Sequence, residues 1–193
     1  MEKVEIVATL GKLLRSEKKQ ECIEFAEKHY PFTIQSVYKR KYSKYQMCRI
    51  FLRDGFIDRY SGARLLFPGM IKILSIEFPD IFKYHKNWKM TDTHMIYWEL
   101  FPTIDHLIPI ARGGTNDENN CLTTSMMRNS AKSNWTVEEI GWTVHHKGKL
   151  NEWDGLCSLF LDLITANTKY SSDKYIKEWG IALNQSLIEI HTN

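Results

Sequence analysis

Four polar residues between positions 105 and 132 are of the types, and at the spacings, that hydrolysis of a phosphodiester bond requires. Asp105 and His106 are adjacent in a segment with strand character, whereas Asn129 and Lys132 lie three apart on one face of a predicted helix. A carboxylate and an amide oxygen are hard ligands that suit Mg²⁺ or Mn²⁺. An imidazole beside such an ion can take a proton from water, and a lysine one helical turn on can hold a phosphate.

The elements that must position these residues can be predicted from the surrounding pattern. Residues 104–110 have strand character, a glycine-containing turn opens at 112–114, and residues 120–124 form a predicted return strand. Thr124 or Ser125 can cap the helix that follows. The predicted order is therefore strand, loop, strand and helix.

One geometric condition applies to the adjacent pair. Neighbouring residues on a regular strand point to opposite faces of the sheet. Asp105 and His106 can therefore serve one phosphate only if the strand ends or distorts at that point.

This stretch resembles the HNH, or ββα-metal, nucleases. The residues that match the motif of that family are Asp105-His106, Gly113-Gly114, Asn120, Asn129 and Lys132. The spacing is 14 residues from His106 to Asn120 and nine from there to Asn129, which is typical of the asparagine-type branch. The match covers about 35 of the 193 residues.

The resemblance implies a role for each matching residue. It implies that His106 is the general base and that Asp105 and Asn129 are ligands of Mg²⁺ or Mn²⁺. It also implies that Asn120 braces the loop that holds His106, although Asn119 could take that role instead. For the fold, it implies an α+β, mainly helical protein built around a ββα-metal module without a zinc ribbon.

The absence of a zinc ribbon is expected because the cysteine pairs that flank the motif in many family members are replaced. Arg59-Tyr60-Ser61-Gly62 and Ser125-Met126-Met127-Arg128 stand where such cysteines would be expected. No structural zinc is therefore predicted, and aromatic packing would have to take its place. The expected packing residues are Trp88, Trp98, Phe101 and Trp135.

The chain is expected to divide into three regions. Residues 1–53 form a helical N-terminal region with a basic stretch, residues 54–135 form the nuclease core around a motif at 104–134, and residues 136–193 are predicted to be helical with interruptions at glycines. Within the core, helices are expected at 70–78 and 93–100.

Positive charge is concentrated in the middle of the chain. Residues 36–149 carry 17 basic and 11 acidic side chains, whereas residues 150–193 carry three and six. The stretch 38–53 holds six basic residues and no acid, with Tyr38, Tyr42 and Tyr45 interleaved. It could contact phosphates, or it could be a solvated helix face whose tyrosines pack inward. The predicted DNA-binding residues are Lys39, Arg40, Lys41, Lys44, Arg49, Arg112, Arg128 and Lys132.

The resemblance and the charge distribution together predict a DNA endonuclease that leaves 5′-phosphate and 3′-hydroxyl ends. The amount of structure around the motif resembles stand-alone type II restriction enzymes of the HNH class. That role predicts double-stranded DNA as substrate, a homodimer and a possible companion methyltransferase. The alternatives are a nicking or low-specificity nuclease of a phage, mobile element or defence system, and a DNA-binding module with a degenerate site.

Composition limits the compartments in which the protein can work. No apolar run approaches the roughly 18 residues of a membrane span, and the first residues lack the pattern of a signal peptide. The four cysteines, Cys22, Cys48, Cys121 and Cys157, are scattered without a CxxC pair. We therefore expect free thiols and a cytoplasmic location, with no membrane partner.

Overall fold

Helices predominate in the structure, a computed structural model that describes residues 1–32 and 42–192. The architecture is α+β, with one two-stranded antiparallel sheet among the helices of the described residues. The chain forms two units, Met1–Ser36 and Val37–Asn193. The sequence placed a boundary at residue 53 instead, but the helix that ends there packs within the larger unit.

The smaller unit is a helical hairpin. Helix α1 (Lys3–Arg15) begins with a capping box between Glu2 and Glu5, and helix α2 (Lys19–His29) packs against it. Ile6 and Cys22 are the buried residues of the two helices. The prediction that the first 30 residues are helical is confirmed.

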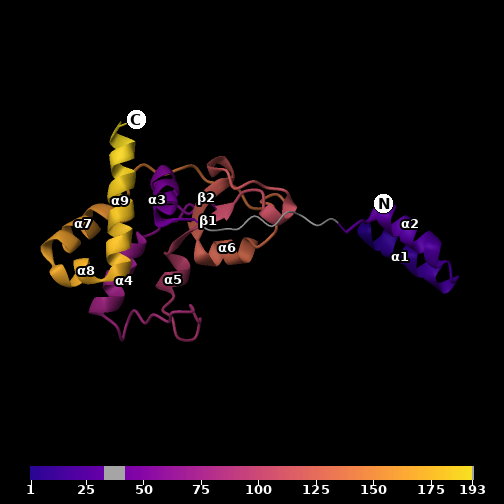
Figure 1. Cartoon of the computed structure of the whole chain (residues 1–193), viewed down its shortest axis with the longest axis horizontal. Helices are drawn as coiled ribbons and strands as arrows, with labels where there is room; N and C mark the ends of the chain where they lie inside the picture. The colour runs from indigo at the N-terminus through magenta and orange to yellow at the C-terminus, as the bar shows by residue number, and fades with distance from the viewer. Residues whose placement is uncertain (33–41, 193) are drawn as a thin grey trace. The chain divides into compact units, whose positions relative to one another are not determined.

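The core of the larger unit lies where three helices meet. Helix α3 (Lys44–Arg53) and helix α4 (Pro68–Glu77) both pack against the last helix, α9 (Lys174–Thr192), as Figure 1 shows. Ser43 starts α3 with a capping box, and Pro68 occupies the first turn of α4, where its missing N–H costs nothing. The buried aromatic side chains between them include Phe51, Phe56, Phe67, Phe160 and Trp179.

A strand, a second strand and a helix follow one another in the middle of the larger unit (Figure 1). Strand β1 (Pro102–His106) pairs antiparallel with β2 (Cys121–Ser125), so that Asp105 lies opposite Leu122 and His106 opposite Cys121. Helix α6 (Met126–Lys132) follows directly. Short 3₁₀ turns, η1 (Ile110–Arg112) and η2 (Glu118–Asn120), lie in the connection between the strands.

The region after α6 differs from the sequence-based expectation. Residues 136–156 were expected to be helical with interruptions, but they form turns and irregular chain. Helix resumes only with α7 (Cys157–Ala166) and α8 (Thr168–Ser172) before α9. The glycines explain the difference, because Gly141 and Gly155 adopt positive φ angles that a continuous helix cannot contain.

Two smaller expectations are also corrected. The short strand expected in 54–62 is a single bridge between Ile57 and Arg64. The helix expected at 93–100 is a single turn, α5 (Ile96–Glu99), which begins after Met95 rather than after Thr91 or Asp92. Within the described residues, no helix is long and apolar enough to cross a bilayer.

Three of the four expected aromatic residues pack together near α5. Trp88 contacts Trp98 and Phe101, with ring centroids 5.9 and 4.7 Å apart. Trp135 does not join them and is 52% exposed, with the Arg112 guanidinium over its ring. The four cysteines are free and buried, and burial raises the pKa of Cys48 to about 12.

Candidate active site

The carboxylate of Asp105 is held between β1, α6 and a buried tyrosine. Its Oδ2 atom lies 2.9 Å from the Lys132 ammonium and accepts a 2.6 Å hydrogen bond from the Tyr60 hydroxyl. Burial, and then the charge of Asp105, raises the pKa of Tyr60, so the phenol stays protonated and donates. No hydrogen bond reaches the other oxygen, Oδ1, from any described residue, which leaves one carboxylate oxygen for a ligand.

Lys132 is fully buried and fastens α6 to β1. Its ammonium donates to the backbone oxygen of His106 at 2.7 Å and binds Asp105 at the same time. The sequence-based prediction that Lys132 holds a phosphate, or contacts DNA, is therefore corrected. A buried ammonium with two protein partners positions the carboxylate instead.

His106 points to a different set of partners from its neighbour, as regular strand geometry requires. Its Nε2 atom lies 2.8 Å from the Tyr42 hydroxyl and 3.0 Å from Oδ1 of Asn116. The partners of Nε2 therefore come from two places, the chain before α3 and the loop between the strands. β1 ends at His106, which is one of the two alternatives that the condition on the adjacent pair allows.

Asn129 lies one helical turn before Lys132 and faces the same strand. Its Nδ2 atom donates to the backbone oxygen of Ile104 at 3.1 Å and lies 3.4 Å from the Thr103 hydroxyl. Because a backbone carbonyl can only accept, this bond fixes the orientation of the amide and leaves Oδ1 as its acceptor atom. The hairpin and α6 thus bring Asn129, Lys132 and Asp105 to one junction.

Asn120 braces the loop between the strands. Its side chain accepts from the backbone N–H of Ile108 at 2.9 Å and donates to the backbone oxygens of Ile108 and Thr115 at 2.9 and 2.8 Å. Asn119 makes none of these bonds and lines a surface pocket beside Arg59. Between the two candidates of the sequence, the loop contacts belong to Asn120.

The same loop requires a glycine at position 114. A Cβ atom on Gly114 would lie 1.9 Å from the backbone oxygen of Ile108, whereas one on Gly113 would meet nothing within 4 Å. We expect Gly114→Ala to lower the free energy of unfolding by about 3 kcal/mol, the upper end of the usual cost of overpacking. Gly113→Ala is the matched control and should cost roughly 1 kcal/mol, because only its left-handed φ is strained. Equal losses in denaturant unfolding would contradict the contact.

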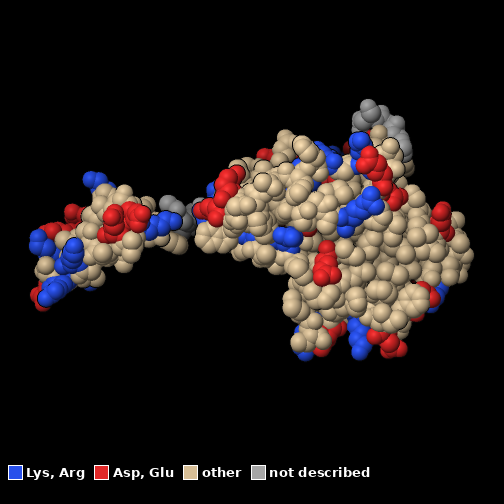
Figure 2. Space-filling view, turned by 180° about the vertical axis from the view of Figure 1, so that it is seen from behind, with Lys and Arg blue, Asp and Glu red and all other residues tan. Residues whose placement is uncertain are grey.

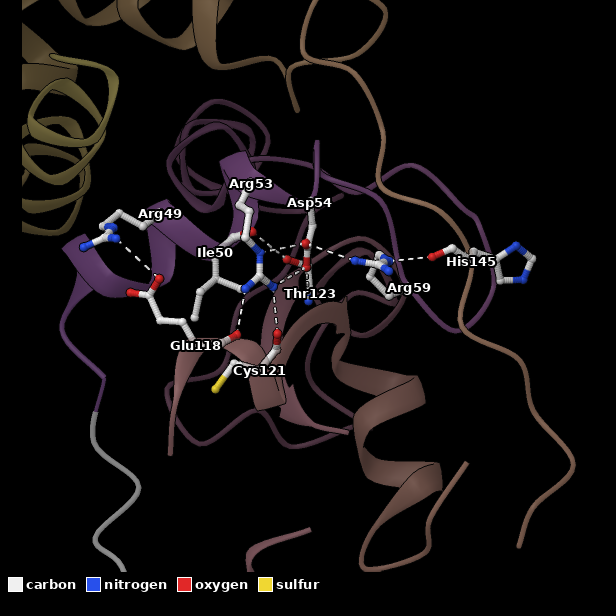
Figure 3. Close-up of polar contacts among 9 residues, drawn as sticks. All are labelled: Arg49, Ile50, Arg53, Asp54, Arg59, Glu118, Cys121, Thr123 and His145. Carbon is white, nitrogen blue, oxygen red and sulfur yellow. Dashed lines mark hydrogen bonds and ion pairs between the residues drawn. The ribbon is translucent and has the colours of Figure 1, made fainter. Parts of the chain in front are cut away.

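A buried carboxylate at the end of α3 supports β2 (Figure 3). Asp54 binds the guanidinium groups of Arg53 and Arg59 at 3.0 and 3.1 Å and accepts from the backbone N–H of Thr123 at 2.8 Å. Arg53 also donates to the backbone oxygen of Cys121 at 2.7 Å. This network ties α3 to the second strand.

A second buried carboxylate serves the end of the same strand. Asp58 accepts from the Thr124 hydroxyl at 2.9 Å and from the backbone N–H groups of Ser125 and Tyr60 at 3.0 and 2.9 Å. Ser125 in turn caps α6 by accepting from the backbone N–H of Arg128. Asp58 therefore fixes the point at which the strand becomes the helix.

The predicted DNA-binding residues do not gather at this site as one group. Lys39, Arg40 and Lys41 lie outside the described residues. The others form contacts within the protein: Lys44 with Glu178 at 2.7 Å, Arg49 with Glu118 and Glu189 at 3.4 and 3.5 Å, Arg112 with Glu139 at 3.2 Å, and Arg128 over the Trp142 ring. Figure 2 likewise shows basic and acidic side chains interspersed on the visible face. Partly exposed ion pairs of this kind are weak, so phosphates could replace the acids.

Sequence reasoning missed Tyr60 and Asn116 as members of the site, and it treated Tyr42 only as part of the basic stretch. Tyr60 was noted only as part of a segment that lacks cysteines. Tyr42 and Tyr60 lie 64 and 45 positions before their partners on β1, and Asn116 lies 10 positions after His106. The position of Asn116 in the loop that directly follows the glycines was the one signal that would have suggested it.

The donor set fits a hard divalent cation. It offers one carboxylate oxygen and one oriented amide oxygen, and Mg²⁺ is usually held by few protein ligands together with water and substrate. Among the described residues, no three His, Cys, Asp or Glu side chains form a metal-binding cluster. Comparison of the chain with models of protein families, with curated proteins and with solved structures found no match.

Proposed function

We propose that this protein is a metal-dependent endonuclease of the ββα-metal, or HNH, type that hydrolyses DNA phosphodiesters to 5′-phosphate and 3′-hydroxyl ends. One observation carries the proposal: a hairpin and its following helix bring Asp105, Asn129 and Lys132 together at one junction, with His106 beside them on β1. The order of elements and the residue types both agree with the motif.

His106 acts as the general base in this proposal. Tyr42 and Asn116 hold the imidazole through Nε2, and the ring takes a proton from the attacking water. In-line displacement at phosphorus requires the nucleophile and the leaving oxygen on opposite sides. The end of β1 at His106 supports the placement of both side chains around one phosphate.

Asp105 and Asn129 would hold Mg²⁺ or Mn²⁺ through Oδ1 of each side chain. When bound, the ion supplies charge stabilisation at the leaving 3′ oxygen. Lys132 and Tyr60 serve as positioning residues, because both bind Oδ2 of Asp105 and so orient the free oxygen. Asn120 keeps the loop after His106 in place.

Supercoiled plasmid tests the metal assignment. Cleavage should require Mg²⁺ or Mn²⁺ and stop on chelation, and Asp105→Ala or Asn129→Ala should each reduce it at least about tenfold, since even outer-shell residues commonly cost 10–100-fold. Asn134→Ala, an exposed asparagine just beyond α6, is the matched control and should cleave normally. Cleavage that is indifferent to chelation would refute the proposal, and binding without any cleavage would favour the DNA-binding module.

The way in which the two DNA strands are cut distinguishes the possible biological roles. A type II restriction enzyme should act as a homodimer and leave one defined double-strand break, because a palindrome presents two equivalent bonds. A nicking or low-specificity nuclease of a phage, mobile element or defence system should instead leave open circles or many ends. Sequencing the ends of digested plasmid distinguishes these outcomes, and a neighbouring methyltransferase gene would favour restriction.

A further inference from the structure

A pocket of about 410 Å³ opens beside α4 and the start of α9, where the proposed reaction places none of its residues. Four aromatic side chains line it: Tyr84, Trp88, Tyr97 and Tyr175. Its volume lies within the range of about 300–1,000 Å³ that is usual for small-molecule sites. A cavity with this many rings favours a flat, aromatic ligand.

The rings form walls that meet at an angle. Tyr84 and Tyr97 have centroids 5.2 Å apart at an interplanar angle of 49°, and Trp88 meets Tyr97 edge to face at 5.7 Å. Trp88 also has a φ of +51°, which is rare for a bulky residue. Backbone strain of this kind concentrates where a side chain must be held for binding.

The charged groups around the pocket balance one another. Lys72 and Lys174 supply two cations, and Asp173 and Glu178 supply two anions, of which Glu178 also binds Lys44 at 2.7 Å. Lys72 already lies 5.5 Å over the Tyr84 ring. Because these charges offset one another, they favour a ligand without a strong net charge in the pocket, and the carboxylates can accept hydrogen bonds from N–H groups at the edge of a neutral ring.

The pocket shares its supports with the candidate active site. Tyr97 lies in α5, and α5 packs against α6, the helix of Asn129 and Lys132. The backbone N–H of Met126, the first residue of α6, also donates to the Phe101 oxygen at 3.2 Å. A nucleic-acid strand that occupied both the pocket and the candidate active site would therefore contact elements that pack against one another.

We propose that this pocket takes an unpaired nucleobase of the nucleic-acid substrate. The base would stack against Tyr84 and Trp88, with Asp173 or Glu178 accepting from its N–H groups and Lys72 or Lys174 beside its phosphate. On duplex DNA the base would have to leave the stack, as in enzymes that extrude a nucleotide. The inference rests on the proposed function for one point, that the ligand is a nucleic acid. It does not depend on cleavage, because binding requires none.

The test is fluorescence anisotropy of the full-length protein with a labelled single-stranded DNA oligonucleotide in EDTA, so that no metal-dependent cleavage occurs. Tyr84→Ala should weaken binding by roughly 5- to 150-fold, the range for losing one base–aromatic stack. Tyr84→Phe keeps the ring and should bind like the wild type. Tyr30→Ala, an exposed tyrosine of the smaller unit, should also leave binding unchanged.

Two further ligands separate base stacking from other modes. An abasic oligonucleotide of the same length should bind more weakly to the wild type and should not distinguish Tyr84→Ala from it. A mononucleotide that bound as tightly as the oligonucleotide would overturn the assignment to a strand, and so would equal affinity of wild type and Tyr84→Ala. If plasmid cleavage fails while oligonucleotide binding depends on Tyr84, the nuclease proposal falls and the pocket stands; the opposite pattern removes only the pocket.

Discussion

Replacing His106 by alanine is expected to slow cleavage of supercoiled plasmid by about 10²–10⁴-fold, the range typical for loss of a general base. The structure gives the reason at the level of single atoms. The His106 imidazole lies at the end of β1, where Tyr42 and Asn116 contact its Nε2 atom. DNA affinity should be retained, because the change removes no cation.

The controls for this variant address folding and specificity. His106 is 5% exposed, so its removal could loosen the hairpin, and His106→Asn keeps a polar side chain of similar bulk while lacking the base. Both variants should melt close to the wild type in thermal unfolding. His146→Ala, at an exposed histidine of the same unit, should cleave at the normal rate. Near wild-type turnover by a folded His106 variant would disprove the catalytic assignment.

Replacing Asp54 by alanine is expected to lower the free energy of unfolding by about 3–5 kcal/mol, the usual cost of breaking a buried ion pair. The carboxylate is fully buried, and its removal leaves Arg53 and Arg59 without their shared partner and the Thr123 N–H without an acceptor. For a chain of 193 residues this corresponds to a fall in Tm of roughly 6–20 °C.

Further variants separate the contribution of the Asp54 charge from that of its hydrogen bonds. Asp54→Asn keeps one acceptor oxygen but loses the charge, so it should be intermediate between the wild type and alanine. Asp162→Ala, an exposed aspartate on α7, should change stability by no more than about 0.5 kcal/mol. If the Tm of Asp54→Ala equalled that of the wild type, the network would not stabilise β2.

The local sequence pattern was sufficient to predict the secondary-structure elements that lie close together in the chain. Strand, loop, strand and helix were predicted from residues 104–134, and each exists within a few residues of its expected bounds. Capping by Ser125 was one of two alternatives, and the hydrogen bond to the Arg128 N–H decides it. These features depend on side-chain periodicity and on caps, which act over three or four residues.

The basic stretch shows where local pattern fails. Its charge was visible in the sequence, but the acids that bind it were not, because Glu178 and Glu189 lie more than 130 positions away on α9. One of the two alternatives placed the tyrosines on a helix face, yet α3 begins only at Lys44 and Tyr42 reaches His106 instead. Charge density along a chain therefore does not predict which cations remain unpaired.

The sequence by itself predicted the α+β class, the order of the hairpin and helix, and Asp105, His106 and Asn129 as candidates, because these follow from short-range spacing, whereas Asn120 was implied by the family resemblance. Only the tertiary structure decided how they are held. Tyr42, Tyr60 and Asp54 reach the hairpin across 45 to 69 positions of sequence, and Lys132 is buried by that packing. Such contacts depend on which surfaces the whole chain buries, and no spacing in the sequence encodes that choice.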